Sequence, residues 1–206
     1  VVVGGVRRSA LISLSNLGDT QMRHAKSGQW WENEGQRALA NNSVSYKFKP
    51  DMDTFMREWL ALYESKSGER GIFNRQAAKK QASLNGRRDA EQEFGCNPCS
   101  EIILRPYQFC NLSEVVVRSS DTQQSLTNKV RLATILGTFQ STLTNFKYLR
   151  NVWKKNTTEE RLLGVSLTGI MDNAMMSGKS THLGMNISAT LNALKEEAIN
   201  TNAVMA

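Results

Sequence analysis

The chain has 206 residues, of which 40% are hydrophobic and 22% charged, and its net charge is +7. These values are ordinary for a globular protein with a hydrophobic core. No apolar run approaches twenty residues, so the sequence predicts no transmembrane helix and no membrane partner.

The first residues indicate a piece of a longer protein. Val1-Val2-Val3 has neither the basic flank nor the cleavage pattern of a signal peptide, and no initiator Met precedes it. The three cysteines are an odd number, which argues against a framework of disulfides and favours a reducing compartment. We therefore expect a fragment of a cytoplasmic protein.

The excess of positive charge is dispersed along the chain. A nucleic-acid-binding protein would have Lys and Arg clustered with aromatic side chains on one face. The dispersed charges therefore predict no nucleic-acid partner. Most basic pairs are expected on a solvated surface. Arg7 and Arg8 differ, because they come just after the Gly4-Gly5 loop. They could contact nucleotide phosphates or form a surface ion pair.

Strands and helices are expected to alternate along the chain, which is typical of an α/β layered or barrel fold. Asp51 or Asp53 could cap the first long helix, and Thr157 or Thr158 could begin a later one. The hydrophobic patterns predict strands near residues 10–14, 37–49, 101–105 and 109–117, and helices near 54–65, 75–92, 125–153 (one or two), 157–178 and 183–206.

The stretch 94–102, with the sequence FGCNPCSEI, carries the most chemistry. Gly95 and Pro98 exclude an ordinary helix interior, and Pro98 favours an extended conformation for the residue before it. In an extended segment Asn97, Cys99 and Glu101 would share one face. This face would offer an amide, a thiol and a carboxylate to one small ligand.

Three other interpretations of the cysteines stay open. Cys96-x-x-Cys99 is a possible half of a zinc site, but the sequence has no second Cys-x-x-Cys and no His pair. A thioredoxin-like redox motif would stand where a strand leads into a helix, and this Cys-x-x-Cys is not expected at such a place. Cys96 could also form an inactivating disulfide with Cys99, or be inert. The chain could also be a non-catalytic nucleotide-binding or assembly fragment.

The motif Asn97-Pro98-Cys99-x-Glu101-Ile102, followed by Phe109-Cys110-Asn111-Leu112-Ser113, resembles the finger loop and next strand of adenosylcobalamin-dependent (class II) ribonucleotide reductases. Four further blocks resemble barrel segments of this family in the expected order. They are GGVRRSA (4–10), RALANNS (37–43), SGERGIFNR (67–75) and ERLLGVSLTG (160–169). The resemblance covers roughly residues 1–178 and five ordered blocks.

The resemblance implies that residues 1–206 are part of a ten-stranded α/β barrel, with the finger loop at about 94–101 and no second domain. It implies that Cys99 carries a thiyl radical and that Glu101 is the general base. By the same likeness Asn97 holds the ribose hydroxyls and Cys110 is one half of the reducing dithiol. Adenosylcobalamin would be the cofactor, with no metal bound by the chain itself.

The family resemblance also implies partners. The substrate would be a ribonucleoside di- or triphosphate, and a thioredoxin-like protein would restore the dithiol. Gly5, Arg7, Arg8 and Ser9 match the loop that connects a deoxynucleotide effector to the substrate site. The second reducing cysteine and the phosphate-binding loop lie outside this chain, so we expect the isolated fragment to be inactive.

Overall fold

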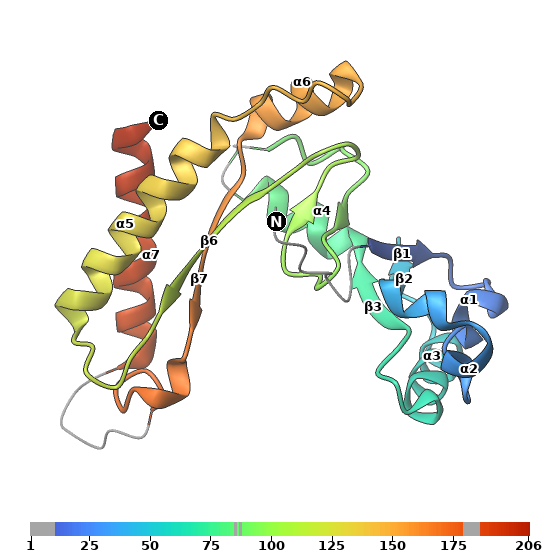
Figure 1. Cartoon of the computed structure of the whole chain (residues 1–206). Helices are drawn as coiled ribbons and strands as arrows, with labels where there is room; N and C mark the ends of the chain where they lie inside the picture. The colour runs from blue at the N-terminus through green and yellow to red at the C-terminus, as the bar shows by residue number, and fades with distance from the viewer. Residues whose placement is uncertain (1–10, 85, 87, 179–185) are drawn as a thin grey trace. The chain divides into compact units, whose positions relative to one another are not determined.

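The computed structural model describes residues 11–84, 86, 88–178 and 186–206 (Figure 1). The chain divides into two compact units, Val1–Pro106 and Tyr107–Ala206. Each unit has its own strands and its own hydrophobic core. The predicted effector residues Gly5, Arg7, Arg8 and Ser9 lie outside the described residues.

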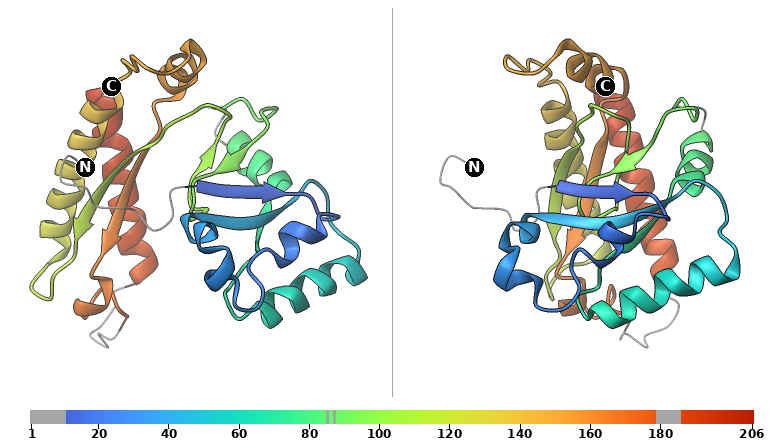
Figure 2. Two further views of the ribbon diagram at one scale, coloured as in Figure 1. Left: turned by 45° about the vertical axis from the view of Figure 1, so that its right-hand side comes forward. Right: turned by 90° about the vertical axis from the view of Figure 1, so that its right-hand side faces the viewer.

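A three-stranded parallel sheet forms the centre of the first unit. Its order is β1 (Leu11–Ser15), β2 (Ala40–Tyr46) and β3 (Gly71–Asn74), with β2 in the middle. Leu14 pairs with Ser43, and Ser43 with Gly71. Parallel neighbours need long crossovers, and helices supply them in both connections (Figure 2).

The helices of the first unit begin where the sequence provides caps. Asp51 accepts a hydrogen bond from the Thr54 backbone at 2.8 Å and begins α3, as predicted. Asn74 caps the next helix by the same type of bond to Ala77. The helices are α1 (Thr20–His24), α2 (Trp30–Asn33), the 3-10 helix η1 (Gly35–Leu39), α3 (Met52–Ser65) and α4 (Arg75–Ser83).

A buried group of charges connects α1 and α3 to the sheet: Arg23 lies on α1, Glu58 on α3, and Arg70 directly precedes β3. The Arg70 guanidinium donates to both oxygens of Glu58, at 2.9 and 2.7 Å, and Arg23 donates to the same carboxylate. Glu58 and Arg70 are each only 3% exposed. Burial raises the pKa of Glu58, but the hydrogen bonds from Arg70 and Arg23 outweigh it and hold the pKa below its usual value.

A short antiparallel hairpin completes the first unit. It consists of β4 (Gly95–Cys96) and β5 (Ile103–Leu104), with Cys96 opposite Ile103. Its base packs in a core of Phe73, Ala78, Ala82, Phe94 and Cys96. Phe94 is fully buried and the Arg88 guanidinium lies 4.9 Å from its ring centre, so the hairpin has a firm base.

The second unit contains a parallel pair of strands, β6 (Asn111–Val116) and β7 (Leu163–Thr168). Two long helices, α5 (Gln123–Ser141) and α7 (Ile187–Met205), lie side by side in this unit (Figure 1). The shorter α6 (Asn151–Glu160) precedes β7, and the 3-10 helix η2 (Ile170–Asp172) follows it. The core of the unit is made by Val115, Val117, Leu126, Val130, Ala133, Met176 and Leu194.

The expected helix over 157–178 is wrong, because residues 163–168 form strand β7. Arg161 adopts a left-handed φ of 42° and ends α6, so the chain turns there without a glycine or proline. After β7, Gly169 has a φ of 72°, and a Cβ at this position would lie 2.5 Å from the Val117 carbonyl oxygen. Apolar residues at 163, 165 and 167 alternate, which fits a strand as well as a helix face.

The mixed α/β class is confirmed, with the described strands arranged as three small sheets. The ten-stranded barrel stays a prediction. None of the helices in the described ranges has the length and apolar character needed to cross a membrane.

Asp121 should make the second unit sensitive to acid. Its carboxylate accepts hydrogen bonds from Lys129 at 2.6 Å, the Arg118 backbone at 2.7 Å and Ser125 at 2.7 Å. Led by the Lys129 bond, these lower the pKa of Asp121 to about 2. Because the pKa of Asp121 is lower in the folded than in the unfolded chain, its carboxylate contributes stability at pH values above the unfolded-state pKa. This contribution is lost as the pH falls toward 2.

We therefore expect Asp121→Asn to destabilise the chain at pH 5 and to have progressively less effect toward pH 2. Urea unfolding of both proteins at several pH values measures this difference. Glu196→Gln, which changes an exposed carboxylate on α7, is the control and should show no such trend. An Asp121→Asn effect that is equal at pH 5 and pH 2 would contradict the prediction.

Candidate active-site turn

The predicted site residues of the first unit lie at the tip of the β4–β5 hairpin. Asn97 continues the pairing beyond β4, since its N–H donates to the Ile102 carbonyl at 3.2 Å. The Ser100 N–H donates to the Asn97 carbonyl at 2.9 Å and closes a turn over residues 97–100. Ser100 adopts a left-handed φ of 67° within this turn.

The expected extended segment over 97–101 is therefore wrong. The alternation that would place Asn97, Cys99 and Glu101 on one face applies to a strand, and the chain reverses direction here instead. The Asn97 side chain is buried at 9% exposure, whereas Cys99 and Glu101 are exposed. The three residues remain close in the chain, with Asn97 and Cys99 in the turn and Glu101 directly after it, and both the thiol and the carboxylate are exposed.

Asn97 is held in place by the turn itself. Its Oδ1 accepts a hydrogen bond from the Ile102 N–H at 2.9 Å. This bond leaves the amide nitrogen as the group that can donate to a ligand. Asn97 can thus serve as a hydrogen-bond donor while its other end supports the turn.

Cys96 differs from Cys99 in both burial and chemistry. Its thiol lies inside the core of the first unit and donates to the Ser100 hydroxyl at 3.5 Å. Burial raises the pKa of the Cys96 thiol and the Glu101 charge adds to the rise, while the Ser100 hydrogen bond opposes it. Cys96 is therefore a protonated, inward-facing thiol, and Cys99 is the exposed sulfur of the pair.

The cysteines are all free thiols in this structure. Within the described ranges, no group of three or more His, Cys, Asp or Glu side chains comes together in a way that could hold a metal ion. Cys110 is half-buried and directly precedes β6 in the second unit. Its relation to Cys99, which belongs to the first unit, stays a prediction.

Sequence reasoning missed one residue that contacts this turn. Asn41, on β2, donates through its side-chain amide to the carbonyl oxygen of Pro98, the residue before Cys99. The two residues are 57 positions apart in the chain. The sequence signal is only an Asn-Asn pair inside an expected strand, and nothing in it connects β2 to the turn.

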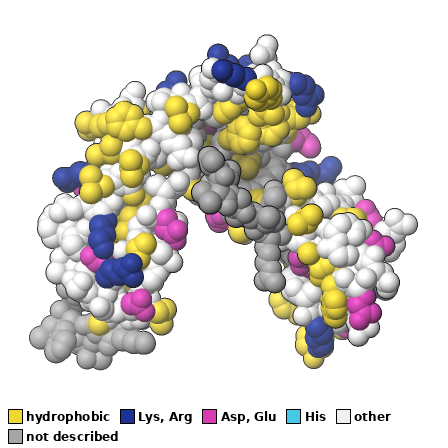
Figure 3. Space-filling model, in the orientation of Figure 1, with side chains coloured by type: hydrophobic (Ala, Val, Ile, Leu, Met, Phe, Trp, Pro, Cys, Tyr) yellow, Lys and Arg dark blue, Asp and Glu magenta, His cyan; other side chains and the backbone are white. Residues whose placement is uncertain are grey.

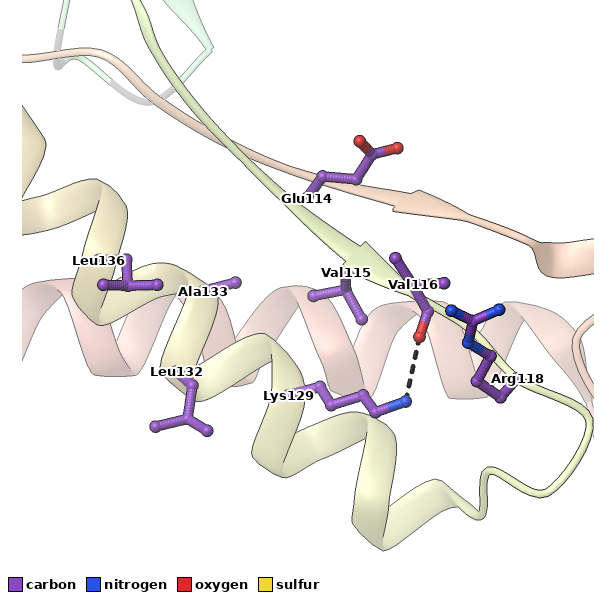
Figure 4. Close-up of a pocket in the computed structure, with 8 residues that line it drawn as sticks. All are labelled: Glu114, Val115, Val116, Arg118, Lys129, Leu132, Ala133 and Leu136. Carbon is purple, nitrogen blue, oxygen red and sulfur yellow. Dashed lines mark hydrogen bonds between the residues drawn. The ribbon is translucent and has the colours of Figure 1, made fainter.

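A separate pocket of about 340 Å³ lies between α5 and β6 in the second unit (Figure 4). Lys129 occupies one side of it and donates to the Val116 carbonyl at 3.0 Å. The Val117 N–H donates to the Thr168 carbonyl and so points toward β7. The Val116 carbonyl belongs to the same peptide group and points the opposite way, to the other edge of β6. The lining contains none of the predicted site residues; it consists of Glu114, Val115, Val116, Arg118, Lys129, Leu132, Ala133 and Leu136.

Comparison with known proteins identifies the class of enzyme that the chain resembles. The chain is 33% identical over 180 residues to an adenosylcobalamin-dependent ribonucleoside-triphosphate reductase of Lacticaseibacillus paracasei. It is 30% identical over 181 residues to the enzyme of this name from Levilactobacillus brevis, and 29% over 180 residues to that from Lactobacillus leichmannii. No protein-family model and no solved structure matches the chain.

These matches cover 84% of the chain but only 22–23% of the relatives. The chain is thus similar, over most of its length, to a segment of about a fifth of a reductase. The particular relatives are adenosylcobalamin-dependent ribonucleoside-triphosphate reductases, so the resemblance predicted from the motifs is confirmed.

Proposed function

We propose that this chain is a segment of an adenosylcobalamin-dependent ribonucleotide reductase and that it supplies the radical cysteine, Cys99. The observation that carries the proposal is the similarity to these reductases over 84% of the chain, together with the Asn97-Pro98-Cys99-x-Glu101 turn. The substrate is a ribonucleoside triphosphate, as the names of the relatives state for those enzymes. The reaction takes place in the cytoplasm, which suits a chain whose cysteines are free thiols.

The exposed thiol of Cys99 fits a cofactor that delivers a radical. When bound, adenosylcobalamin supplies a carbon radical that can take a hydrogen atom from sulfur. Cys99 is exposed at the tip of a turn, so its S–H is accessible to a partner from outside the hairpin. The family resemblance implies that most of the cobalamin-facing surface belongs to polypeptide outside this chain.

The residues of the turn divide the remaining chemistry. The Cys99 thiyl takes the hydrogen atom from C3′ of the ribose and later returns it. Glu101 accepts the proton of the 3′-hydroxyl as general base, which requires a group within hydrogen-bond reach of the substrate. The Asn97 amide nitrogen donates to a ribose hydroxyl, since its Oδ1 is already bonded to Ile102.

Cys110 provides the reducing electrons together with a second cysteine outside the chain. The 2′-hydroxyl leaves as water, and the dithiol is oxidised to a disulfide as the ribonucleotide becomes a deoxyribonucleotide. One disulfide forms for each C2′–O bond that is replaced by C2′–H, so two electrons balance the reaction. A thioredoxin-like dithiol protein then restores the pair by thiol–disulfide exchange.

The surface of the second unit supports a role as part of a larger protein. Hydrophobic side chains are visible on the face of this unit that Figure 3 shows. On α5, Leu132, Leu136 and Phe139 are 62%, 67% and 60% exposed. An apolar stripe of this kind is typical of a surface that packs against further structure. We also propose that Gly5, Arg7, Arg8 and Ser9 respond to a deoxynucleotide effector in the complete enzyme.

The test compares the isolated chain with the complete polypeptide that contains it. The complete protein, with adenosylcobalamin, a ribonucleoside triphosphate and a dithiol, should form deoxyribonucleotide, detected by chromatography. The isolated 206-residue chain should give no turnover, because it lacks the second reducing cysteine. A complete protein without any cobalamin-dependent product would overturn the proposal, as would stoichiometric zinc on the chain that is required for its folding.

A further inference from the structure

The two peptide groups on either side of Cys99 are each held by a hydrogen bond. The carbonyl of Pro98 accepts from the Asn41 side chain, and the N–H of Ser100 donates to the Asn97 carbonyl at 2.9 Å. A peptide unit is planar, so fixing its carbonyl also fixes the plane that ends at the next Cα. The direction of the Cα–Cβ bond of Cys99 is therefore set by both flanking peptide groups.

These two bonds differ in what they connect. The bond from Ser100 to Asn97 closes the turn on itself. The bond from Asn41 joins the turn to the central strand of the three-stranded sheet, where Asn41 pairs with Ile12 of β1. Asn41 thus transmits the position of the sheet to the residue before Cys99.

The strand that carries Asn41 is itself firmly anchored. The backbone N–H of Asn42 donates to Glu69 at 2.9 Å. Glu69 also receives a hydrogen bond from the Lys26 ammonium at 2.8 Å. A donor on a rigid strand holds its acceptor more accurately than a donor on a loop.

We propose that Asn41 is a positioning residue for the radical chemistry, which acts by fixing the peptide that precedes Cys99. This inference rests on the proposed function, because it assigns Asn41 a task in the same reaction. Hydrogen-atom transfer requires the sulfur and the ribose carbon in a defined geometry, and a displacement of about 1 Å can reduce a rate about 100-fold. Asn41 contributes through the turn and does not itself touch the reacting atoms.

The experiment replaces Asn41 with leucine, which has a similar shape but no donor, in the complete reductase. We expect kcat to fall by about 10- to 100-fold, with the KM for the ribonucleotide essentially unchanged. Loss of the Asn41 bond to Pro98 should lower the free energy that is needed to open the turn. Amide hydrogen exchange at Ser100 should therefore accelerate by up to about tenfold, the factor that corresponds to one lost hydrogen bond. Asn41→Gln keeps an amide donor and should lie closer to the unmodified protein in both measurements.

Asn42→Leu is the matched control. It removes a side-chain amide bond from the neighbouring position of the same strand, but that bond leads to Met22 rather than to the turn. This variant should lose stability without a change in kcat or in the exchange of the Ser100 amide.

The outcomes separate the two proposals. If Asn41→Leu behaves like Asn42→Leu in both kcat and Ser100 exchange, the positioning role is refuted while the reductase function stands. The same conclusion follows if KM rises and kcat does not change. If the unmodified complete protein has no reductase activity, the proposed function fails and the positioning role of Asn41 in that reaction fails with it. The Ser100 exchange data would then still show whether the Asn41–Pro98 hydrogen bond stabilises the turn.

Discussion

Cys99→Ser is expected to abolish deoxyribonucleotide formation by the complete reductase. The O–H bond of serine is too strong to yield a radical under conditions in which a thiol does, so hydrogen abstraction stops. Cys99 is exposed at the tip of the turn, and serine fits there without disturbing the core. The change therefore separates chemistry from folding, and a product assay together with radical detection by electron paramagnetic resonance measures it.

Two other cysteine variants make this result interpretable. Cys110→Ser should retain hydrogen abstraction but block reduction, so that the nucleotide decomposes with release of its base. Cys96→Ser keeps a donor for the Ser100 hydroxyl and should retain most of the activity, because Cys96 points into the core. Normal product formation by Cys99→Ser would refute the mechanism at its first step.

The largest expected effect on stability comes from Glu58→Ala. This change leaves the guanidinium groups of Arg23 and Arg70 without their shared buried carboxylate. Removing one partner of a buried ion pair costs about 3–5 kcal/mol, since the remaining charge has lost both water and counter-charge. Unfolding of the chain by urea, followed by far-ultraviolet circular dichroism, should show the first unit destabilised by this amount.

Asp53→Ala on the same helix provides the comparison. Asp53 also pairs with an arginine, Arg57 at 2.8 Å, but the two side chains are 71% and 69% exposed. An exposed pair contributes about 0–1 kcal/mol. Equal losses for Glu58→Ala and Asp53→Ala would show that burial does not govern the strength of the Glu58 group.

Parts of the fold that depend on local signals could be predicted from the sequence. The beginning of α3 follows from Asp51, whose side chain bonds to the backbone three residues on. The strand β2 follows from the alternation of Val44 and Tyr46 with polar residues. These elements carry their evidence within a few residues, so no knowledge of distant contacts is needed.

The strand β7 could not be predicted in the same way. Leu163, Val165 and Leu167 suit a strand, but together with Leu162 they also suit one side of a helix. The pairing of β7 with β6, some fifty residues earlier, decides between the two. The end of α6 at Arg161 could not be predicted either, because the residue that adopts the left-handed conformation there is not a glycine.

For the candidate site, the sequence indicated the residue types correctly but not their arrangement. The Asn-Pro-Cys motif identified the segment, and Pro98 suggested an extended chain, whereas the hydrogen bonds of Asn97 fold it into a turn. The bond from Asn41 could not be anticipated, since it depends on which strand lies beside the hairpin. Periodicity describes a single element and cannot report a contact of this kind.

The bond from Lys129 to the Val116 carbonyl has a consequence for the behaviour of the chain in solution. Among the described residues, β6 pairs with β7 alone, so its other edge can accept a strand from a second molecule. Such edges are starting points for aggregation, and a lysine placed across them is a common protection. A strand adding here would have to displace an ammonium group that also holds Asp121. We therefore expect Lys129 to act as a gatekeeper against fibril-like association when the chain is produced at high concentration.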